Sequence, residues 1–250
     1  MILIGGGALL SRAANYATRL GLAVDFACCP PSDPSCVALK RLGIPFIESC
    51  DPNTALPPIL KECSDNVAFS INNLHILEDD LLSAGVSFFN IHSGLVQQYR
   101  GRAEVCIFAA LCKGEKSYGV TLHRILPKQR IDSGPVIAQL LFEISNRAGF
   151  ADVLTNTVDT CQSIFEANVS QILANDFMVT NVSMCEGSYS YKHLAEICRE
   201  ADPACLARAS DFGVYSGSFP ILENTVESIA NLQNLGRNTQ QMSAALADSK

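Results

Sequence analysis

The sequence has no stretch that would cross a membrane and no arrangement of cysteines that would hold zinc. Its 250 residues contain no run of eighteen apolar side chains, so we expect no membrane-spanning helix. The first four residues lack the basic flank of a signal peptide and instead predict a strand. No Cys-x-x-Cys pair is present, which argues against a zinc site, and we expect no bound metal.

The chain also lacks a surplus of basic residues. It has 18 lysines and arginines against 25 aspartates and glutamates, which gives a net charge of −7 at pH 7. Proteins that hold a phosphate backbone do so with basic patches. The acidic balance therefore argues against tRNA or DNA as a partner.

Cysteine, by contrast, is abundant: the chain has eleven. The number is odd, and several cysteines lie inside apolar runs such as Val105–Phe108, a pattern that argues against a disulfide framework. Buried thiols of this kind are typical of a reduced compartment, so we expect a cytoplasmic protein.

The length and the 48% hydrophobic content are sufficient for one domain with a full core and a small appendage. The chain opens with a predicted strand over 1–4, a turn at Gly5–Gly7, a helix over 9–20 and a second strand over 22–28, which together predict a βαβ unit. The glycine triplet is compatible with a phosphate site at the helix N-terminus or with a plain tight turn. Its spacing is not that of the dinucleotide fingerprint, which favours the turn.

Apolar runs and helical periodicity continue this alternation down to residue 175. Further strands are predicted over 45–47, 66–71, 86–89, 118–125 and 136–142, and further helices over 36–42, 56–63, 77–82, 103–111 and 151–173. The expected fold class is α/β, with an open, mostly parallel, twisted sheet and helices on both faces.

The character of the chain changes after Asn175. A strand is predicted over 177–182, and Pro203 interrupts any single helix over 194–206. The last residues are rich in asparagine, glutamine and serine and predict a flexible tail or an interdomain linker. We therefore divide the chain into a main domain (1–175), a small C-terminal extension (176–231) and a tail or linker (232–250).

Three polar residues follow the strands of the main domain in a pattern that suggests a site. Alternation along an extended strand places Asn90 and His92 on the same side, and Asp132 precedes a Ser-Gly-Pro turn between two further strands. An amide can donate to an oxyanion, an imidazole can move protons near neutral pH, and a carboxylate can orient either the imidazole or a water. Asn-x-His alone is a common pair, but open α/β sheets hold ligands at these strand ends.

The same residues resemble a known family, the folate-dependent formyltransferases. That family includes the methionyl-tRNA, glycinamide-ribonucleotide and amino-sugar formyltransferases, and domains attached to non-ribosomal peptide synthetases. Its pattern Asn-x-His-Pro-Ser-Leu-Leu-Pro, followed by a glycine, is matched at Asn90, Ile91, His92, Leu95, Tyr99, Arg100 and Gly101 and departs at Ser93, Gly94 and Gln97. Gly119–His123 resembles the family's Gly-Val-Thr-Ile-His strand, and Ile131–Ile137 resembles its Leu-Asp-Ala-Gly-Pro-Ile-Ile.

The resemblance implies a Rossmann-like formyltransferase fold, with 10-formyltetrahydrofolate as donor and a primary amine as acceptor. It implies Asn90, His92 and Asp132 as the catalytic groups. It also implies a pterin slot formed by Ile76 and Leu77 and by the loop Pro127–Asp132, which contains Gln129, Arg130 and Ile131.

Several of these implied roles have a structural alternative. Tyr99 and Arg100 would line the acceptor side, or would only anchor their loop. For Ile76 and Leu77 the alternative to pterin contact is ordinary core packing. His123 is expected to be a packed histidine of the core.

A second resemblance concerns the extension. Ser188–Lys192 and Ser210–Tyr215 look like segments that follow the catalytic domain in peptide-synthetase-associated members. The acceptor this suggests is an amino-acid-derived or secondary-metabolite amine, either free or tethered to a carrier within a biosynthetic assembly line. The alternatives are a non-catalytic docking domain of such an assembly line, an amino-sugar formyltransferase and a glycinamide-ribonucleotide formyltransferase.

Overall fold

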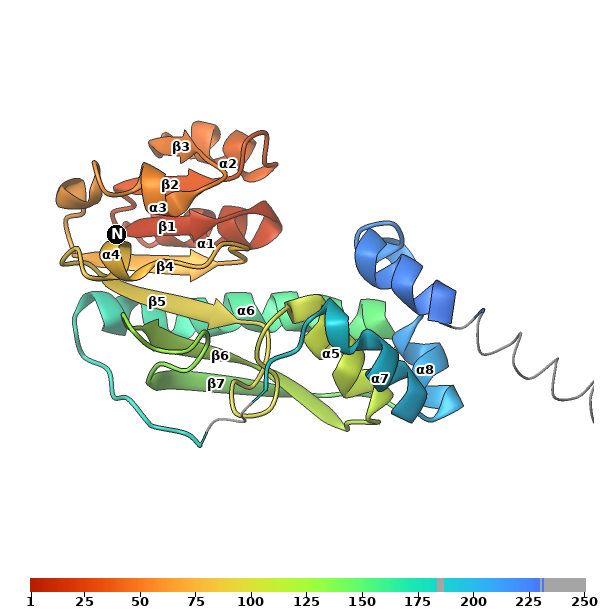
Figure 1. Cartoon of the computed structure of the whole chain (residues 1–250). Coiled ribbons are helices and arrows are strands. Elements are labelled where there is room, and N and C mark those ends of the chain that lie inside the picture. The colour runs from red at the N-terminus through yellow and green to blue at the C-terminus, as the bar shows by residue number, and fades with distance from the viewer. Residues whose placement is uncertain (184–186, 230, 232–250) are drawn as a thin grey trace, which may run out of the picture.

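Seven strands form one sheet in the computed structural model, which describes residues 1–183, 187–229 and 231 (Figure 1). Their order across the sheet is β3-β2-β1-β4-β5-β6-β7. The strands are β1 (Ile2–Gly5), β2 (Phe26–Cys29), β3 (Phe46–Glu48), β4 (Val67–Ile71), β5 (Ser87–His92), β6 (Ser117–Ile125) and β7 (Val136–Glu143). Strands β1 to β5 are parallel, whereas β6 and β7 are antiparallel to their neighbours. The prediction of an open, mostly parallel sheet is confirmed.

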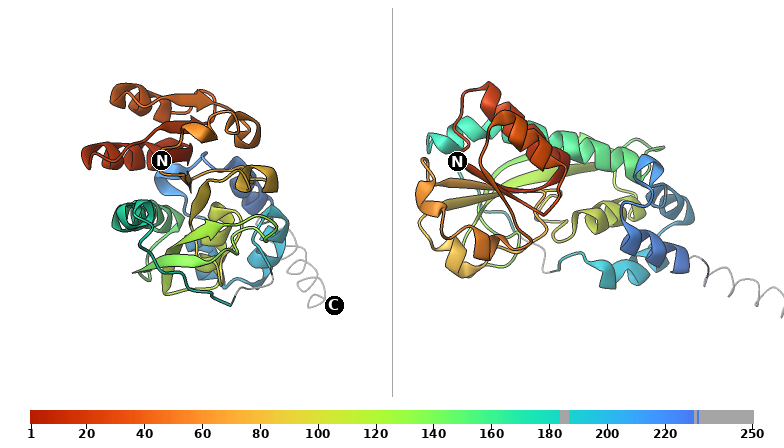
Figure 2. Two further views of the ribbon diagram at one scale, coloured as in Figure 1. Left: turned by 90° about the vertical axis from the view of Figure 1, so that its left-hand side faces the viewer. Right: turned by 90° about the horizontal axis from the view of Figure 1, so that it is seen from above.

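Helices cover both faces of this sheet, as predicted. They are α1 (Gly7–Arg19), α2 (Ser35–Leu42), α3 (Pro52–Ala55), α4 (Asp79–Leu82), α5 (Ala103–Cys112), α6 (Phe150–Leu173), α7 (Leu194–Glu200) and α8 (Pro203–Ala209). Helices α1 and α6 lie side by side on one face, and α3 and α4 lie on the other (Figure 2). The first pair is joined by an edge-on contact between Tyr16 and Phe165, whose ring centroids are 6.3 Å apart.

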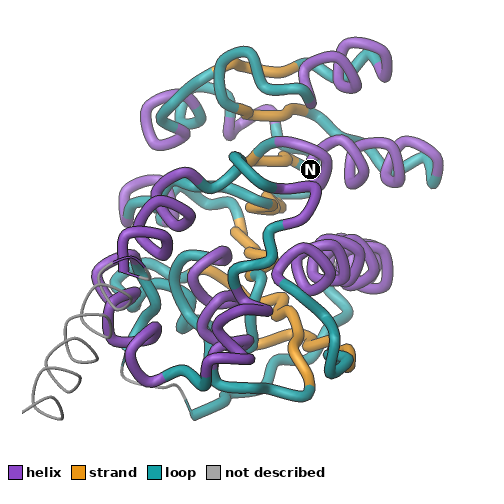
Figure 3. Tube along the Cα trace, turned by 90° about the vertical axis from the view of Figure 1, so that its right-hand side faces the viewer, coloured by secondary structure: helices purple, strands orange, loops and turns teal. Residues whose placement is uncertain are grey.

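Helix α5 is apolar on every side and is buried accordingly. All of its residues from Glu104 to Cys112 are buried. Such a helix has to be surrounded by other elements, and it packs with the start of α6, with α7 and α8, and with Leu222 and Val226 of a helical segment over 220–229. Figure 3 views the molecule from this end. The C-terminal extension therefore shares an apolar cluster with the main domain and lies near the carboxyl ends of the strands (Figure 1).

Two predicted helices differ from the structure. The helix expected over 56–63 is wrong: α3 ends before it, and only a 3-10 turn follows at Leu60–Glu62. Pro57 and Pro58 interrupt the apolar pattern there, because proline disfavours helical conformation in the residue before it. The helix expected over 77–82 is confined to α4, whose first residues are acidic.

Two predicted strands also differ from the structure in extent. The second strand begins at Phe26 rather than at residue 22. The strand expected over 177–182 is reduced to one bridge, in which Thr180 and Val136 exchange backbone hydrogen bonds of 2.7 and 3.0 Å. The predicted tail (232–250) lies outside the described residues. Within the described part of the chain, no helix has the length and apolar character needed to cross a membrane.

Candidate active site

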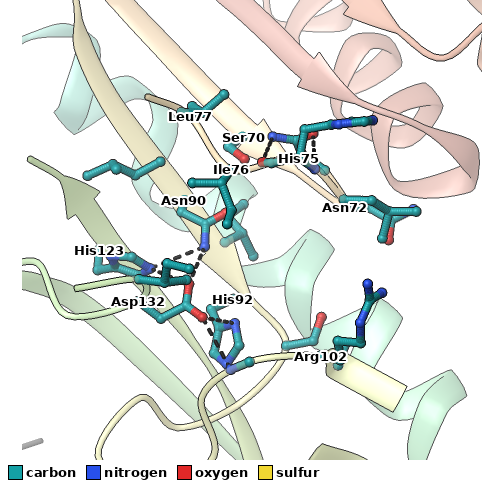
Figure 4. Close-up of a pocket in the computed structure, with 18 of the residues that line it drawn as sticks. Ser70, Asn72, His75, Ile76, Leu77, Asn90, His92, Arg102, His123 and Asp132 are labelled. Atoms are coloured by element: carbon teal, nitrogen blue, oxygen red, sulfur yellow. Dashed lines mark hydrogen bonds and ion pairs between the residues drawn. The ribbon is translucent and has the colours of Figure 1, made fainter. Parts of the chain in front are cut away.

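The candidate site forms where β5 ends beside β6 (Figure 4). Asn90 and His92 occupy alternate positions of β5, and both line the same cavity. Across the antiparallel pair, Asn90 is in register with His123 of β6. The strand pairing therefore brings a second imidazole to the site. Asn90 Nδ2 lies 3.2 Å from His123 Nε2.

Asp132 reaches this cluster from the loop between β6 and β7. Its backbone has a φ of 54°, a left-handed conformation that Asp tolerates better than most residues. Two positions further on, a side chain at Gly134 would collide with the carbonyl oxygen of Arg124, at 1.8 Å. The close passage of the loop over β6 thus requires the glycine of the Ser-Gly-Pro turn and places the Asp132 carboxylate among the polar groups of β5 and β6.

The Asp132 carboxylate lies between the two imidazoles. Its Oδ2 is 3.5 Å from His92 Nδ1 and accepts a 3.3 Å hydrogen bond from the backbone N–H of Gly101. Its Oδ1 is 3.6 Å from His123 Nε2 and accepts a 3.3 Å hydrogen bond from Asn90. Burial alone would raise the pKa of Asp132, but the charge of His92 and the contacts with His123 and Gly101 outweigh it and lower the pKa to about 2. The carboxyl group is therefore ionised throughout the neutral range.

His92 is held at both of its ring nitrogens. Nε2 lies 2.6 Å from the carbonyl oxygen of Tyr99, a partner that can only accept, so this nitrogen carries a proton. Nδ1 faces the Asp132 carboxylate. The imidazolium form presents a donor to each of these oxygens, so the geometry suits a positively charged His92. His92 is buried, with 6% of its surface exposed.

His123 packs in the core, as expected, and it also lies in the candidate site. It is buried, and its Nδ1 lies 3.0 Å from the carbonyl oxygen of Arg124, which makes Nε2 the acceptor in the neutral ring. Nε2 can then receive the N–H of Asn90. The sequence signal for this role was the match of Gly119–His123 to a family strand, but the register with Asn90 was not evident from the sequence.

The cluster opens into a cavity of about 1040 Å³. Five residues predicted for the donor slot lie on its wall: Ile76, Leu77, Gln129, Arg130 and Ile131. Ile76 and Ile131 are 62% and 56% exposed, so neither is committed to the core. Leu77 is buried in an apolar cluster with Leu81 and Leu82 of α4, so it also packs in the core. Contact of these residues with a folate remains a prediction.

Tyr99 and Arg100 do not line the cavity. The Tyr99 hydroxyl donates to Glu115 over 2.8 Å, and its ring stacks on that of Tyr189 with centroids 5.5 Å apart. Arg100 is buried and donates a 2.9 Å hydrogen bond from Nη2 to the carbonyl oxygen of Gly187. Both residues join their loop to the C-terminal extension, which is the structural alternative considered for them. Their neighbours, Gly101 to Glu104, reach the cavity instead.

The three departures from the family loop have a structural account. At Gly94 a Cβ would lie 2.4 Å from the Tyr99 carbonyl oxygen and 2.9 Å from His92 Nε2, so the loop can approach His92 only with glycine there. Gln97 exchanges side-chain hydrogen bonds of 2.7 and 3.2 Å with Gln139 on β7. The hydroxyl of Ser93 lies 3.7 Å from the thiol of Cys161 on α6, and its backbone carbonyl oxygen accepts a 2.7 Å hydrogen bond from Tyr118 of β6. The altered loop is therefore fixed to the sheet and holds His92 in place.

The glycine turn before α1 is closed by a side chain of the protein itself. Asp33 accepts a 2.8 Å hydrogen bond from the N–H of Gly7, and a Cβ at Gly6 would lie 2.5 Å from the second carboxylate oxygen. An anion-binding helix N-terminus is thus occupied by a carboxylate. This geometry supports the tight turn over a phosphate site.

Part of the chain matches a known protein family. Residues 56–167 match the family model described as formyl transferase. That segment carries Asn90, His92, His123 and Asp132. The described part of the chain has no group of three potential metal ligands.

The fold is shared with solved structures of formyltransferases. An N-formyltransferase from Helicobacter canadensis, in complex with folinic acid and dTDP-3-aminofucose, is 18% identical with a TM-score of 0.59, over 77% of this chain and 72% of that one. A phosphoribosylglycinamide formyltransferase from Anaplasma phagocytophilum is 19% identical with a TM-score of 0.63, over 76% and 93%. One from Bacillus halodurans is 21% identical with a TM-score of 0.61, over 69% and 94%.

Residues 56–167 are thus similar to a formyl transferase domain, and the fold of the chain is that of solved formyltransferases. The expectation of a formyltransferase fold is confirmed. The class of acceptor is not defined by these matches.

Proposed function

We propose that the protein moves a formyl group from 10-formyltetrahydrofolate to a primary amine of an amino-acid-derived or secondary-metabolite substrate. The observation that supports this most strongly is the enclosure of one carboxylate, Asp132, by Asn90 and by two imidazoles, at the wall of a cavity large enough for a folate and an acceptor. Folate-bound relatives share the fold, and their complexes with folinic acid or 5-formyltetrahydrofolate support folate as the donor.

The reaction is acyl transfer through a tetrahedral intermediate. The neutral amine attacks the formyl carbon, and negative charge develops on the formyl oxygen. Asn90 and protonated His92 stabilise that oxyanion. The bond between the formyl carbon and N10 of the folate then breaks, and N10 takes up the proton that the amine loses.

Asp132 acts mainly through charge in this mechanism. A carboxyl group with a pKa of about 2 is a weak base at neutral pH, so it is poorly suited to keep a proton. Its position favours the charged form of His92, and its remaining oxygen lone pairs can orient a water that carries the proton from the amine to N10. The Asn90 amide donates to Asp132, so it has to turn toward the formyl oxygen to stabilise the oxyanion.

The proposed acceptor carries its amine on an amino acid or a related metabolite, free or tethered to a carrier. An amino sugar is the second candidate, because the Helicobacter canadensis protein of the same fold was solved with dTDP-3-aminofucose. A docking domain without activity is disfavoured by the retention of Asn90, His92 and Asp132 in contact with one another.

Turnover tests the proposal directly. The purified protein is incubated with 10-formyltetrahydrofolate and a panel of amino acids, amino-acid thioesters and nucleotide amino sugars, and formation of tetrahydrofolate is followed. Amine-dependent release that is lost in His92→Ala supports formyl transfer. Tight folate binding with no release on any amine would favour the docking domain.

A further inference from the structure

One part of the cavity wall has no role in the mechanism above. It begins at the N-terminus of α5 with Arg102 and Glu104, continues through Ser188–Ser190 of the C-terminal extension, and includes four apolar side chains. Those four are Leu9, Leu154, Val158 and Phe219. This acceptor wall, as we call these residues together, combines one cation, one buried carboxylate and an apolar surface.

Arg102 is the cation of the acceptor wall, and its guanidinium contacts Tyr191 and Glu104. It stacks over the ring of Tyr191, 5.0 Å from the ring centroid, and Nη1 lies 3.9 Å from a carboxylate oxygen of Glu104. Glu104 is in turn bound by the hydroxyl of Tyr191 over 2.5 Å. Half of the Arg102 side chain remains exposed, and it extends into the cavity toward Asn72 in Figure 4. A stacked guanidinium with a free edge is the usual receptor for a carboxylate or a phosphate.

The surrounding charges favour an anion with a single charge. The carboxylate of Glu104 offsets much of the charge of Arg102, so a doubly charged phosphate would meet little net attraction there. Elsewhere on the cavity wall, Arg124 and Arg130 are outnumbered by Glu78, Asp79 and Asp80. The N-terminus of α1, near Asn72, already binds the carboxylate of Asp33. Phosphate esters and nucleotide diphosphates are therefore poorly matched to the acceptor wall. A carboxylate has a single charge, for which the single cation Arg102 is sufficient.

The apolar part of the acceptor wall indicates what accompanies that carboxylate. Leu154 and Val158 lie four residues apart on α6 and so face the same side of the helix. Phe219 packs edge-on against Phe150, with centroids 5.5 Å apart, which fixes its position. Leu9, in the first half of α1, adds a third aliphatic group. Such a surface suits an aliphatic or aromatic side chain rather than a sugar.

We propose that Arg102 is the acceptor anchor: it binds the carboxylate of a free α-amino acid whose apolar side chain packs on Leu154, Val158 and Phe219. This proposal rests on the proposed function, whose acceptor it specifies. The carboxylate and side chain on the acceptor wall leave the α-amine directed toward Asn90 and His92, which line the same cavity.

Binding of L-leucine and L-leucinamide compares two ligands that differ in the carboxylate alone. Each is titrated by calorimetry into protein saturated with 5-formyltetrahydrofolate, which occupies the donor site without reacting. L-leucine is expected to bind about 10- to 100-fold more tightly than the amide, as charge-assisted hydrogen bonds imply. Arg102→Met, which keeps a flexible side chain against Tyr191, is expected to abolish that preference. Arg102→Lys should keep only part of it, because the planar fork is lost.

Two further variants test whether the preference for the carboxylate comes from Arg102 itself or from the structure around it. Arg19→Ala removes an exposed guanidinium at the far end of α1 and should leave the preference unchanged. Tyr191→Phe keeps the ring under Arg102 but removes the hydroxyl bound to Glu104, and the preference should persist. In turnover, Arg102→Met should raise KM for L-leucine by about the same 10- to 100-fold with little change in kcat.

Three results would overturn the anchor: equal binding of acid and amide to the wild type, an unchanged preference in Arg102→Met, or no binding of L-leucine. Tighter binding of a leucyl thioester than of L-leucine would likewise count against it and favour a carrier-tethered acceptor. A protein that does not bind 5-formyltetrahydrofolate at all would contradict the proposed function instead. The same leucine titrations on the unloaded protein would still decide the role of Arg102.

Discussion

Asp132 Oδ2 lies 3.5 Å from Nδ1 of His92, while Nε2 of the same ring is 2.6 Å from the carbonyl oxygen of Tyr99. The imidazole is therefore fixed between a carboxylate oxygen and a carbonyl oxygen, neither of which can donate a hydrogen bond. This arrangement favours positive charge on His92 beside the position proposed for the oxyanion.

Replacing Asn90 removes the neutral donor that we propose for the oxyanion. Asn90→Ala is expected to lower kcat by about 100- to 1000-fold, the usual cost of one such donor. Folate affinity should change little, because the donor acts mainly in the transition state. Steady-state kinetics together with calorimetry on the same variant measure both quantities. A variant with unchanged kcat would exclude Asn90 from the oxyanion site.

Asp132 should make folding stability depend on acid pH. Its pKa is about 2 in the folded protein against 3.8 for the unperturbed group. A lowered carboxyl pKa stabilises the protein above the unfolded value and loses that effect as pH falls through the folded value. We therefore expect about 2.5 kcal/mol of stability at pH 7 to be lost between about pH 4 and pH 2.

Chemical denaturation of the wild type and of Asp132→Asn across pH 2–7 measures this contribution. The difference in unfolding free energy between the two proteins should shrink as the pH falls from about 4 to about 2. A difference that stays constant over this range would show that the carboxyl group is not held ionised by its neighbours. The same pKa predicts that an acid limb in the activity profile above pH 4 arises from another group.

Gly94 allows the loop to approach His92. Gly94→Ala places a methyl group 2.4 Å from the Tyr99 carbonyl oxygen and 2.9 Å from His92 Nε2, so the hydrogen bond between them must shift. We expect kcat to fall by about 10- to 100-fold from the displaced imidazole. Gly187→Ala is a matched control, because an added Cβ there meets nothing within 4 Å. Equal activity of the two variants would contradict the account of the loop.

The C-terminal extension should contribute to the stability of the whole chain. Leu222 is fully buried in the cluster around α5, so Leu222→Ala is expected to lower the unfolding free energy by about 2–5 kcal/mol. Val214 in the same extension is 89% exposed, and Val214→Ala should change it by less than about 0.5 kcal/mol. Denaturation of both variants in one cooperative transition would show the shared core. A separate early transition in Leu222→Ala would show an independently folding extension.

Local patterns were enough to predict much of the sheet and part of the site. The alternation in β5 placed Asn90 and His92 on one side, and the Ser-Gly-Pro turn placed Asp132 after a strand. These inferences depend only on residues that are close together in the sequence, which is why the structure agrees with them. The helix expected over 56–63 failed for a local reason as well, since its prolines outweigh its apolar spacing.

Non-local contacts explain what the sequence left unpredicted. His123 enters the site through its register with Asn90 across the antiparallel strands, which no local pattern specifies. Tyr99 turns away from the cavity because its ring stacks on Tyr189, far along the chain in the extension. The backbone N–H of Arg102 donates to the carbonyl oxygen of the same Tyr189, so the extension also holds this part of the loop. Arg102 lines the cavity from that position.

We expect the cluster around Asp132 to act on a folate-bound formyl group. Calorimetric titration of 5-formyltetrahydrofolate into the wild type and into Asp132→Ala tests it most directly. Tight binding by the wild type that weakens about tenfold or more in the variant is the predicted result. A well-folded wild type that does not bind this ligand would contradict the account.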